Sequence, residues 1–410
     1  MTPPPERAVL RERLAAVRQH TRVLAATLSA EDMSLQSMPD ASPTKWHLAH
    51  TTWFFETVVL LAHAPGYAPF NPQWLPLFNS YYESLGPRHP RPQRGLLSRP
   101  SADEVLAYRS AIDQALADFM AQADTDAYAA AAPLLELGLQ HEQQHQELLL
   151  TDMLHAFAQN PLLPAWQPGA SPQAPPALSG WSPHPGGETE VGHRAGAGFA
   201  FDNETPRHRV LLQPHALARG LVTNGEFLQF MQDGGYGRPA LWLSEGWAQV
   251  QAQGWRAPLY WQLDPAAPAK APSGVYGLHG LQPWQAAAPA CHLSFFEAAA
   301  YAEWAGARLP TEFEWEAAAE REAAAPGGFS DLHGRVWQWT RSSYDPYPRF
   351  RPWAGAVGEY NGKFMVGQIV LRGSSLATPP GHARHSYRNF FPPAARWQFA
   401  GLRLARDGGV

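Results

Sequence analysis

Residues 133–157 read PLLELGLQHEQQHQELLLTDMLHAF, with leucines and histidines at helical spacing. Residues three or four apart share one face of a helix, so this stretch predicts a helix over about 132–158. Its inward face would carry Leu134, Leu137, His141, His145 and Leu148. Two imidazoles on an apolar face need polar partners or a metal ion. The two histidines are therefore either a buried, hydrogen-bonded pair or two ligands of a metal.

The remainder of the first 158 residues also has helical patterns. Residues 5–29 mix Leu, Val and Ala with Arg at helical spacing. Ser42 and Pro43 are typical of a helix start before WHLAHTTWFFETVVLLAHA, and Ser101 with Glu104 predicts a capping box before the next helix. The segment 66–100 is rich in Pro, Gly and Arg and is expected to form one long loop. Four helices and one long loop predict a helical bundle over residues 1–158.

The character of the chain changes after residue 158. Residues 159–185 are rich in Pro, Ala and Ser and predict a linker. Residues 186–410 consist of short segments with many Gly, Trp and Tyr residues, and two clear helical stretches begin at Asn224 and Ser294. We expect short strands in irregular loops around these helices, which places the whole chain in the α+β class.

A third ligand for a metal at the two histidines could come from the WHLAH motif. His47 and His50 lie on different stripes of that helix, and periodicity does not choose between them. Glu142 or Glu147 could instead complete a site of two histidines and one carboxylate, although Glu147 is expected to point elsewhere on its helix. Imidazole suits iron, zinc, copper and nickel, so ligand type alone does not name the metal.

Composition excludes several classes of protein. The 410 residues carry a net charge of −5, which argues against a nucleic-acid binder. No apolar run reaches the roughly 18 residues of a membrane span, and the first residues lack the apolar centre of a secretory signal. A single cysteine, Cys291, excludes an intramolecular disulfide and a multi-cysteine metal site. We therefore expect a cytoplasmic protein; its oligomeric state is left open.

The long loop carries two further kinds of candidate residue. Tyr81 and Tyr82 are adjacent, and a tyrosine near an oxidising metal can deliver a proton or an electron; elsewhere such a pair is ordinary packing. Four arginines follow, and they form either a solvated basic loop or a site for a carboxylate substrate, which the fork geometry of arginine favours. These four are Arg88, Arg91, Arg94 and Arg99.

Together, several motifs resemble the ergothioneine-biosynthesis sulfoxide synthases. They are SPTKWHLAHTTWFFE, YYESLGPRHPRPQRGLLSRPS, HEQQHQELLLTDMLH, EVGH, FAFDNETPRH, LVTNGEF, ARLPTEFEWE, EYNGKFMVGQIVLRG and SYRNFFPPAARWQFAGLRLA. The resemblance covers roughly residues 5–406 and is specific only when the motifs are taken together. It implies a DinB-like four-helix bundle at residues 1–158 and, at residues 186–410, a formylglycine-generating-enzyme-like domain of C-type-lectin-like fold.

The resemblance also implies a metal and its ligands. The matching positions for a non-haem iron(II), Fe(2+), held by three histidines are His50, His141 and His145. Members of this family use dioxygen to join a thiol to hercynine, the trimethylated histidine, and the product is a sulfoxide. The new bond forms at the imidazole carbon between the two nitrogens.

Substrate-binding residues follow by the same analogy. Gln144 and Asn389 are expected to contact hercynine, and Phe390 matches an aromatic residue of the trimethylammonium pocket. Tyr81 and Tyr82 match a tyrosine pair of the branch that uses free cysteine.

A second branch uses γ-glutamylcysteine and differs from this chain at two positions. It has a tyrosine before the VLRG stretch, where this chain has Gln368, and an acidic residue at the position of Phe391. Both differences favour a small thiol as co-substrate. Arg91 is the residue that we expect to bind the carboxylate of that co-substrate.

Further departures keep a selenium-using alternative open. The usual GGS-C-ATP reads GSSLATP here, with Ser374 and Leu376, and the usual GDVWEW reads GRVWQW, with Arg335 and Gln338. Selenoneine synthases join a selenosugar to hercynine with the same iron centre, and sugar hydroxyls favour polar pocket residues such as Ser374 and Gln338. Two other classes are weighed against these enzymes: a zinc-dependent thiol transferase and a non-enzymatic ligand-binding module.

Overall fold

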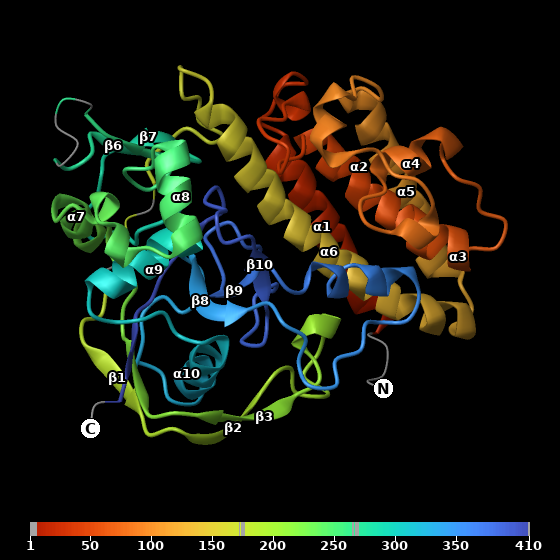
Figure 1. Ribbon diagram of the computed structural model, residues 1–410. Coiled ribbons are helices and arrows are strands. Elements are labelled where there is room, and N and C mark those ends of the chain that lie inside the picture. The colour runs from red at the N-terminus through yellow and green to blue at the C-terminus, as the bar shows by residue number, and fades with distance from the viewer. Residues whose placement is uncertain (1–5, 172, 174–176, 265, 267–269, 409–410) are drawn as a thin grey trace. The chain divides into compact units, whose positions relative to one another are not determined.

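The chain forms two compact units in a computed structural model, which describes residues 6–171, 173, 177–264, 266 and 270–408 (Figure 1). The first unit comprises Met1–Trp166 and Trp353–Tyr360, and the second comprises Gln167–Pro352 and Asn361–Val410. Of the expected linker 159–185, residues 172 and 174–176 lie outside the described residues, as do residues 1–5 of the expected bundle. No helix in the described ranges has both the length and the hydropathy that crossing a membrane requires.

Long helices build the first unit. They are α1 (Arg7–Ala25), α2 (Thr44–Phe54) with its continuation through a π-helical turn (Phe55–Leu60) into α3 (Leu61–His63), α5 (Ala102–Gln122) and α6 (Thr125–Ala158). In Figure 1 the red α1 and the yellow α6 run side by side, and α2 packs on both α5 and α6. The core between them includes Phe55, Leu60, Ile112, Leu116 and Leu135. The bundle expected from the sequence is confirmed.

Local sequence signals predict only some of the ends of these helices. Ser101 and Glu104 form the predicted capping box at the start of α5. Helix α6 begins at Thr125, a full turn and more before the predicted start, because Asp124 caps it and Pro133 is accommodated inside the helix. A proline inside a helix removes one main-chain hydrogen bond and usually ends the helix.

The segment 66–100 is not a single loop. It contains α4 (Leu75–Phe78) and three 3₁₀ turns, at Pro72–Trp74, Glu83–Leu85 and Arg91–Leu96. The side chain of Asn79 is buried and donates to the carbonyls of Tyr82 and Gly86, at 3.0 and 3.1 Å. These side-chain bonds to the main chain, which a composition rich in Pro and Gly does not reveal, hold the segment in a defined shape.

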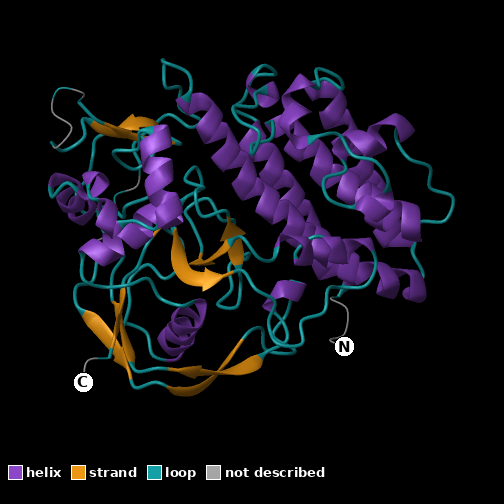
Figure 2. Ribbon diagram, viewed as in Figure 1, coloured by secondary structure: helices purple, strands orange, loops and turns teal. Residues whose placement is uncertain are grey.

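Short strands and helices build the second unit, as expected for an α+β protein (Figure 2). Its central sheet has the order β10-β9-β8-β11, with β8 at Trp337–Ser343, β9 at Ile369–Gly373, β10 at Asn389–Phe391 and β11 at Ala400–Gly401. Strand β9 is antiparallel to both β8 and β10, and β11 is parallel to β8. Three smaller sheets are β1-β4-β12 (Trp181–His184, His215–Ala218, Ala405–Asp407), β2-β3 (Gly187–Val191, His208–Leu212) and β5-β6-β7 (Trp261–Gln262, Gly274–Gly277, Gly280–Gln282).

The helices of the second unit lie in the segments between strands. Helices α7 (Asn224–Gln232) and α9 (Phe295–Trp304) confirm the two predicted stretches. Helices α8 (Ser244–Gln253) and α10 (Glu312–Ala324) were not expected. Thr311 and Glu314 form a capping box at the start of α10, so its sequence did carry a helix signal.

One segment of the C-terminal half belongs to the first unit. In the residues Trp353–Tyr360, the Glu359 carboxylate accepts hydrogen bonds from the main-chain N–H groups of Glu83 and Ser84, at 3.0 and 3.1 Å. The ring of Tyr360 lies 5.6 Å from that of Tyr81. This segment therefore supports the loop that carries the two candidate tyrosines, although it was expected in the second domain.

The packing at Gly138 supplies a stability test. A Cβ added there would lie 2.4 Å from Cε1 of the buried Phe55 ring. We expect Gly138→Ala to lower the free energy of unfolding by about 1–3 kcal/mol, because a rigid aromatic side chain must move. Urea denaturation measures this change. Ala130→Ser, at an exposed position of the same helix, should change it by less than about 0.5 kcal/mol, and equal effects of both variants would contradict the packing argument.

Candidate metal centre

Three buried histidines converge within the first unit. His50 comes from α2, and His141 and His145 come from successive turns of α6. One ring nitrogen from each lies within 4.8 Å of the other two, and Nε2 of His50 is 3.2 Å from Nε2 of His141. The spacing of four residues on α6 and the packing of α2 against α6 bring the rings together.

Hydrogen bonds orient two of these rings. Nδ1 of His50 lies 2.6 Å from the carbonyl oxygen of Phe78, so it carries the proton and leaves the Nε2 lone pair free. Nδ1 of His145 lies 2.8 Å from Nδ1 of His47. Nδ1 of His141 is buried and has no hydrogen-bond partner among the described residues.

The environment keeps the three rings uncharged. Burial lowers the pKa of His50 and His145 well below the ordinary histidine value, and it lowers the pKa of His141 to about 4. Neutral imidazoles with converging lone pairs fit a divalent transition metal, and three such ligands leave coordination positions open. The residues present therefore suit a catalytic rather than a closed structural metal site.

The structure distinguishes the two histidines of WHLAH. His50 belongs to the cluster, whereas His47 lies behind His145. Nε2 of His47 is 3.0 Å from Oδ2 of Asp152, which comes from α6. Asp152 was not expected from the sequence, although it lies seven residues after His145 and therefore on the same face of the helix.

The carboxylate alternatives do not join the cluster. Among the described residues, neither Glu142 nor Glu147 lies in a group of three metal-binding side chains. The buried Glu142 carboxylate accepts hydrogen bonds from Arg109, from Thr21 at 2.5 Å and from Arg18 at 3.0 Å. Burial alone would raise the pKa of Glu142, but the two guanidinium groups lower it to about 2. The Glu142 carboxylate therefore pairs with arginine side chains inside the bundle and does not join the histidine cluster.

Aromatic rings surround the histidines. Trp46 stacks on His50, with ring centroids 4.6 Å apart, and the Arg94 guanidinium lies 3.4 Å from the Trp46 ring centroid. On another side of the cluster, Phe54 lies 4.7 Å from His141. A low-polarity wall of this kind strengthens electrostatic interactions at the centre.

The tyrosine pair lies beside this wall. Trp53 stacks on His50 at 5.7 Å, and Tyr82 lies 5.7 Å from Trp53. Tyr82 is buried, and that burial, followed by the nearby Tyr81 and Glu359, raises the pKa of its hydroxyl. The hydroxyl therefore keeps its proton at neutral pH. Tyr81 is half-buried.

The arginines of the loop differ in their surroundings. Arg91 donates to the main-chain carbonyl of Asp40. Arg94 is buried and donates to the hydroxyls of Ser42 and Ser80, at 2.9 and 3.3 Å, while it stacks on Trp46. Arg94 therefore has direct contact with a ring that packs on the histidine cluster, a feature that the sequence did not distinguish among the four arginines.

The expected hercynine residues of the second unit lie on β10. Asn389 accepts a hydrogen bond from the Phe390 N–H at 2.9 Å, and Phe390 stacks on Tyr344 with ring centroids 4.0 Å apart. Phe391 lies 6.0 Å from Trp397. Gln144, the other expected hercynine residue, is half-buried on α6 in the first unit.

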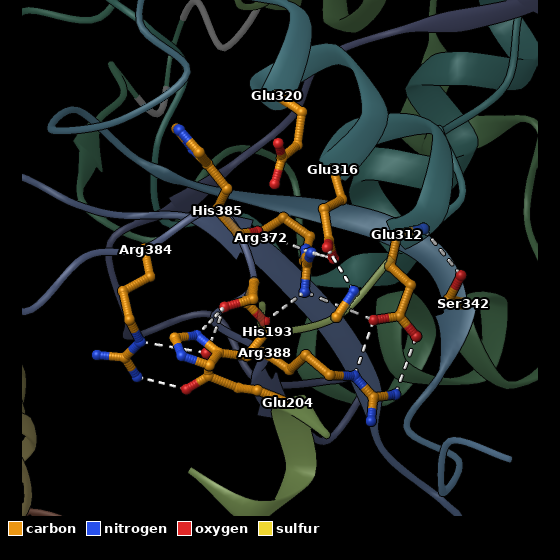
Figure 3. Close-up of polar contacts among 12 residues, drawn as sticks. His193, Glu204, Glu312, Glu316, Glu320, Ser342, Arg372, Arg384, His385 and Arg388 are labelled. Atoms are coloured by element: carbon orange, nitrogen blue, oxygen red, sulfur yellow. Dashed lines mark hydrogen bonds and ion pairs between the residues drawn. The ribbon is translucent and has the colours of Figure 1, made fainter. Parts of the chain in front are cut away.

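A buried charge network precedes β10 in the second unit (Figure 3). Arg388 donates to both carboxylate oxygens of Glu312, at 2.8 and 2.9 Å, and Arg372 donates to Glu316. Figure 3 shows Glu312 and Glu316 on one helix, α10, facing the two arginines. Through Arg372 these pairs connect α10 to β9, and through Arg388 they connect it to the residue just before β10.

Ser374 and Gln338, which differ from the usual family pattern, form hydrogen bonds within the second unit. The Ser374 hydroxyl, which is buried, accepts from the Gly334 N–H at 2.8 Å. The buried Gln338 accepts from Trp315 and from Arg403, both at 2.9 Å, and donates to the Leu332 carbonyl at 2.8 Å. Both side chains thus make hydrogen bonds within the second unit, and the selenosugar alternative stays a prediction.

Family models match both parts of the chain. Residues 13–149 match the DinB superfamily, and residues 171–326 and 322–408 match the Sulfatase-modifying factor enzyme 1-like domain. The formylglycine-generating enzyme of Streptomyces coelicolor is 37% identical over 163 residues, which cover 38% of this chain and 48% of that protein. Among solved structures, PvdO from Pseudomonas aeruginosa is 20% identical, with a TM-score of 0.32, over 57% of this chain and 100% of its own.

Two relatives match almost from end to end. The hercynine oxygenase of Mycolicibacterium smegmatis is 32% identical over 448 aligned residues, which cover 98% of this chain and 99% of that protein. The hercynine oxygenase of Mycolicibacterium thermoresistibile is 33% identical over 452 aligned residues, with 98% and 96% covered. The resemblance noted in the sequence is confirmed, and the chain belongs to the hercynine oxygenase family.

Proposed function

We propose that this chain is an iron(II)- and dioxygen-dependent oxidoreductase that joins a small thiol, such as cysteine, to hercynine in ergothioneine biosynthesis. The observation that carries the proposal is the convergence of three neutral imidazoles, His50, His141 and His145, in a member of the hercynine oxygenase family. The Ergothioneine biosynthesis protein 1 of Schizosaccharomyces pombe is 24% identical over 235 residues, which cover 51% of this chain and 28% of that protein, and its name is consistent with the same pathway.

The overall reaction balances with one molecule of dioxygen. Hercynine loses the hydrogen on the carbon between its ring nitrogens, and the thiol loses its S–H hydrogen. A carbon–sulfur bond forms, one oxygen atom goes to sulfur, and the other leaves as water with the two hydrogens. Dioxygen accepts four electrons, two for the new bond and two for the oxidation of sulfur to the sulfoxide.

The chain supplies the ligands and a proton donor. When bound by the three histidines, iron(II) provides a template for the substrates and a one-electron relay to dioxygen. The Nδ1–H bond of His50 to the Phe78 carbonyl keeps Nε2 directed at the centre. The protonated hydroxyl of Tyr82, one ring removed from His50, is the proposed proton donor, with Tyr81 beside it.

The remaining site residues are proposed from the family resemblance. Gln144, Asn389 and Phe390 bind hercynine, with Phe390 against the trimethylammonium group by cation–π attraction. Arg91 binds the carboxylate of the thiol, and Phe391 excludes a larger γ-glutamyl co-substrate.

Removing the tyrosine hydroxyls tests the proton donor. We expect Tyr82→Phe to shift the products from hercynyl sulfoxide toward oxidised thiol, because reduced oxygen then lacks a nearby proton at the step that leads to coupling. Mass spectrometry of both products measures the partition, with Tyr81→Phe in parallel. Tyr67→Phe is the matched control, because it removes a tyrosine hydroxyl of the same unit that donates to Glu56 at 2.9 Å and lies outside the histidine cluster. An unaltered partition in both Tyr82→Phe and Tyr81→Phe would remove the proposed role.

The choice of co-substrate is tested by competition. Iron-loaded protein receives hercynine, dioxygen and equal amounts of cysteine, γ-glutamylcysteine and a selenosugar, and mass spectrometry identifies the adduct. We expect the cysteine adduct. A dominant selenosugar adduct would instead identify a selenoneine synthase. Activity with zinc in place of iron that transfers the thiol to an electrophile, with departure of its leaving group and without oxygen consumption, would indicate a zinc-dependent thiol transferase. Binding of hercynine with no product under any condition would indicate a ligand-binding module.

A further inference from the structure

A chain of hydrogen bonds leads from His145 to a buried carboxylate. Nδ1 of His145 lies 2.8 Å from Nδ1 of His47, and Nε2 of His47 lies 3.0 Å from Oδ2 of Asp152. The same oxygen accepts the main-chain N–H of Ser42 at 2.8 Å. His47 is 3% exposed and Asp152 is 5% exposed, so water does not compete strongly for these contacts.

The positions of the protons follow from the chemistry of the groups. An ionised carboxylate only accepts hydrogen bonds, so Nε2 of His47 carries a proton. When His47 carries only that proton, its Nδ1 has the lone pair and accepts a hydrogen bond from His145 Nδ1–H, at the observed distance of 2.8 Å. Nε2 of His145 is left with its lone pair facing the other two histidines. A proton on Nδ1 of His47 would reverse the last bond and remove that lone pair from the centre.

The three histidines of the centre are not held alike. His50 donates to an uncharged carbonyl, that of Phe78, and Nδ1 of His141 has no partner among the described residues. His145 alone of the three is connected, through His47, to an anion. Hydrogen bonding of a metal-bound histidine to a carboxylate fixes its tautomer and raises its basicity as a ligand.

We infer that His47 and Asp152 are positioning residues for the metal centre: they hold His145 with its proton on Nδ1 and transmit the negative charge of Asp152 to the bound metal. The inference extends the proposed function, because it names residues that set the affinity and the reduction potential of the iron. A more basic ligand favours the more highly charged metal, so the chain lowers the potential of the iron(III)/iron(II) pair.

The substitutions separate charge from hydrogen bonding. In Asp152→Asn, the amide oxygen can still accept from both His47 and Ser42, so mainly the charge is lost. In His47→Gln, the amide oxygen can accept from His145 while the amide N–H donates to Asp152, which preserves the direction of the chain. His47→Leu removes both side-chain hydrogen bonds, the one to His145 and the one to Asp152. Glu136→Gln is the matched control, because Glu136 is a mostly buried carboxylate of the same helix that pairs with Arg13.

The first measurement is metal affinity, by competition of the apoprotein with a chelator for cobalt(II) and zinc(II), which needs no catalysis. We expect affinities about 10–100-fold weaker in Asp152→Asn and His47→Leu. His47→Gln should bind the metals more tightly than His47→Leu, and Glu136→Gln should keep the native affinity. The second is the midpoint potential of the iron-loaded protein, which should rise in Asp152→Asn. Circular dichroism checks that each variant is folded.

The outcomes distinguish this inference from the proposed function. Native cobalt(II) affinity and native potential in folded Asp152→Asn and His47→Leu would overturn the inference, even if the native chain forms hercynyl sulfoxide. An equal loss in His47→Gln and His47→Leu would also overturn it, since packing rather than the hydrogen-bond chain would then matter. The expected affinity pattern in a protein that forms no sulfoxide would leave the inference standing and refute the proposed function.

Discussion

A His141→Ala variant is expected to lose bound iron and to form hercynyl sulfoxide at least about 10³-fold more slowly than the native chain. Three imidazoles are few ligands for iron(II), and removal of one leaves two side chains and water to hold the ion. The contribution of a catalytic metal is several kcal/mol of transition-state stabilisation, and about 4 kcal/mol corresponds to a factor of roughly 10³. Iron per chain after anaerobic reconstitution and initial rates of product formation measure both effects.

The control for this variant is another histidine of the same bundle. His63, in α3, is half-buried and lies outside the cluster of three, so His63→Ala should retain native iron content and rate. The outcome that would end the metal hypothesis is full iron occupancy together with native activity in His141→Ala. Loss of activity with iron retained would mean that His141 acts on a substrate and not as a ligand.

Part of this centre could be predicted from residue spacing alone. The four-residue interval between His141 and His145 places both on one face of a helix, and the leucines before and after them identify that face as inward. The choice between His47 and His50 could not be made in this way. All 11 residues of α2 are buried, so this helix has no polar face from which to read its orientation.

The supporting groups come from contacts that leave no local pattern. The carbonyl of Phe78 orients His50 through its main chain, which any residue type would provide. Glu359 caps the turn Glu83–Leu85 across more than half of the sequence, so no linear motif connects them. The family resemblance identified His50 as a ligand, whereas the hydrogen bonds that orient its ring could be found only in the structure.

Some of the missed features did have signals. The Thr311–Glu314 capping box predicts a helix start, yet the aromatic and charged residues of α10 were interpreted as short packed elements. The buried arginines of the second unit had no such signal. Arginine is mostly exposed in proteins, and the buried Arg372 and Arg388 pair with carboxylates of α10, which is another element.

The last prediction concerns the buried Arg388. Arg388→Met is expected to lower the free energy of unfolding by about 3–5 kcal/mol, because Glu312 would remain buried without its main partner. Both residues are 2% exposed, and Arg388 also donates to the carbonyls of Asn203 and Asp345, at 3.0 and 2.9 Å. Urea denaturation followed by tryptophan fluorescence measures the loss.

Two further variants show whether the lost stability comes from the uncompensated charge. Arg209→Met removes an exposed arginine whose contact with Glu188 is 3.8 Å, and it should cost less than about 1 kcal/mol. Adding Glu312→Leu to Arg388→Met removes the stranded carboxylate, and replacement of a buried ion pair by apolar residues is often neutral. The double variant should therefore be more stable than Arg388→Met alone. If it is less stable by the sum of both single effects, the two side chains contribute independently, and the charge pairing that connects α10 to β10 is not what stabilises this part of the second unit.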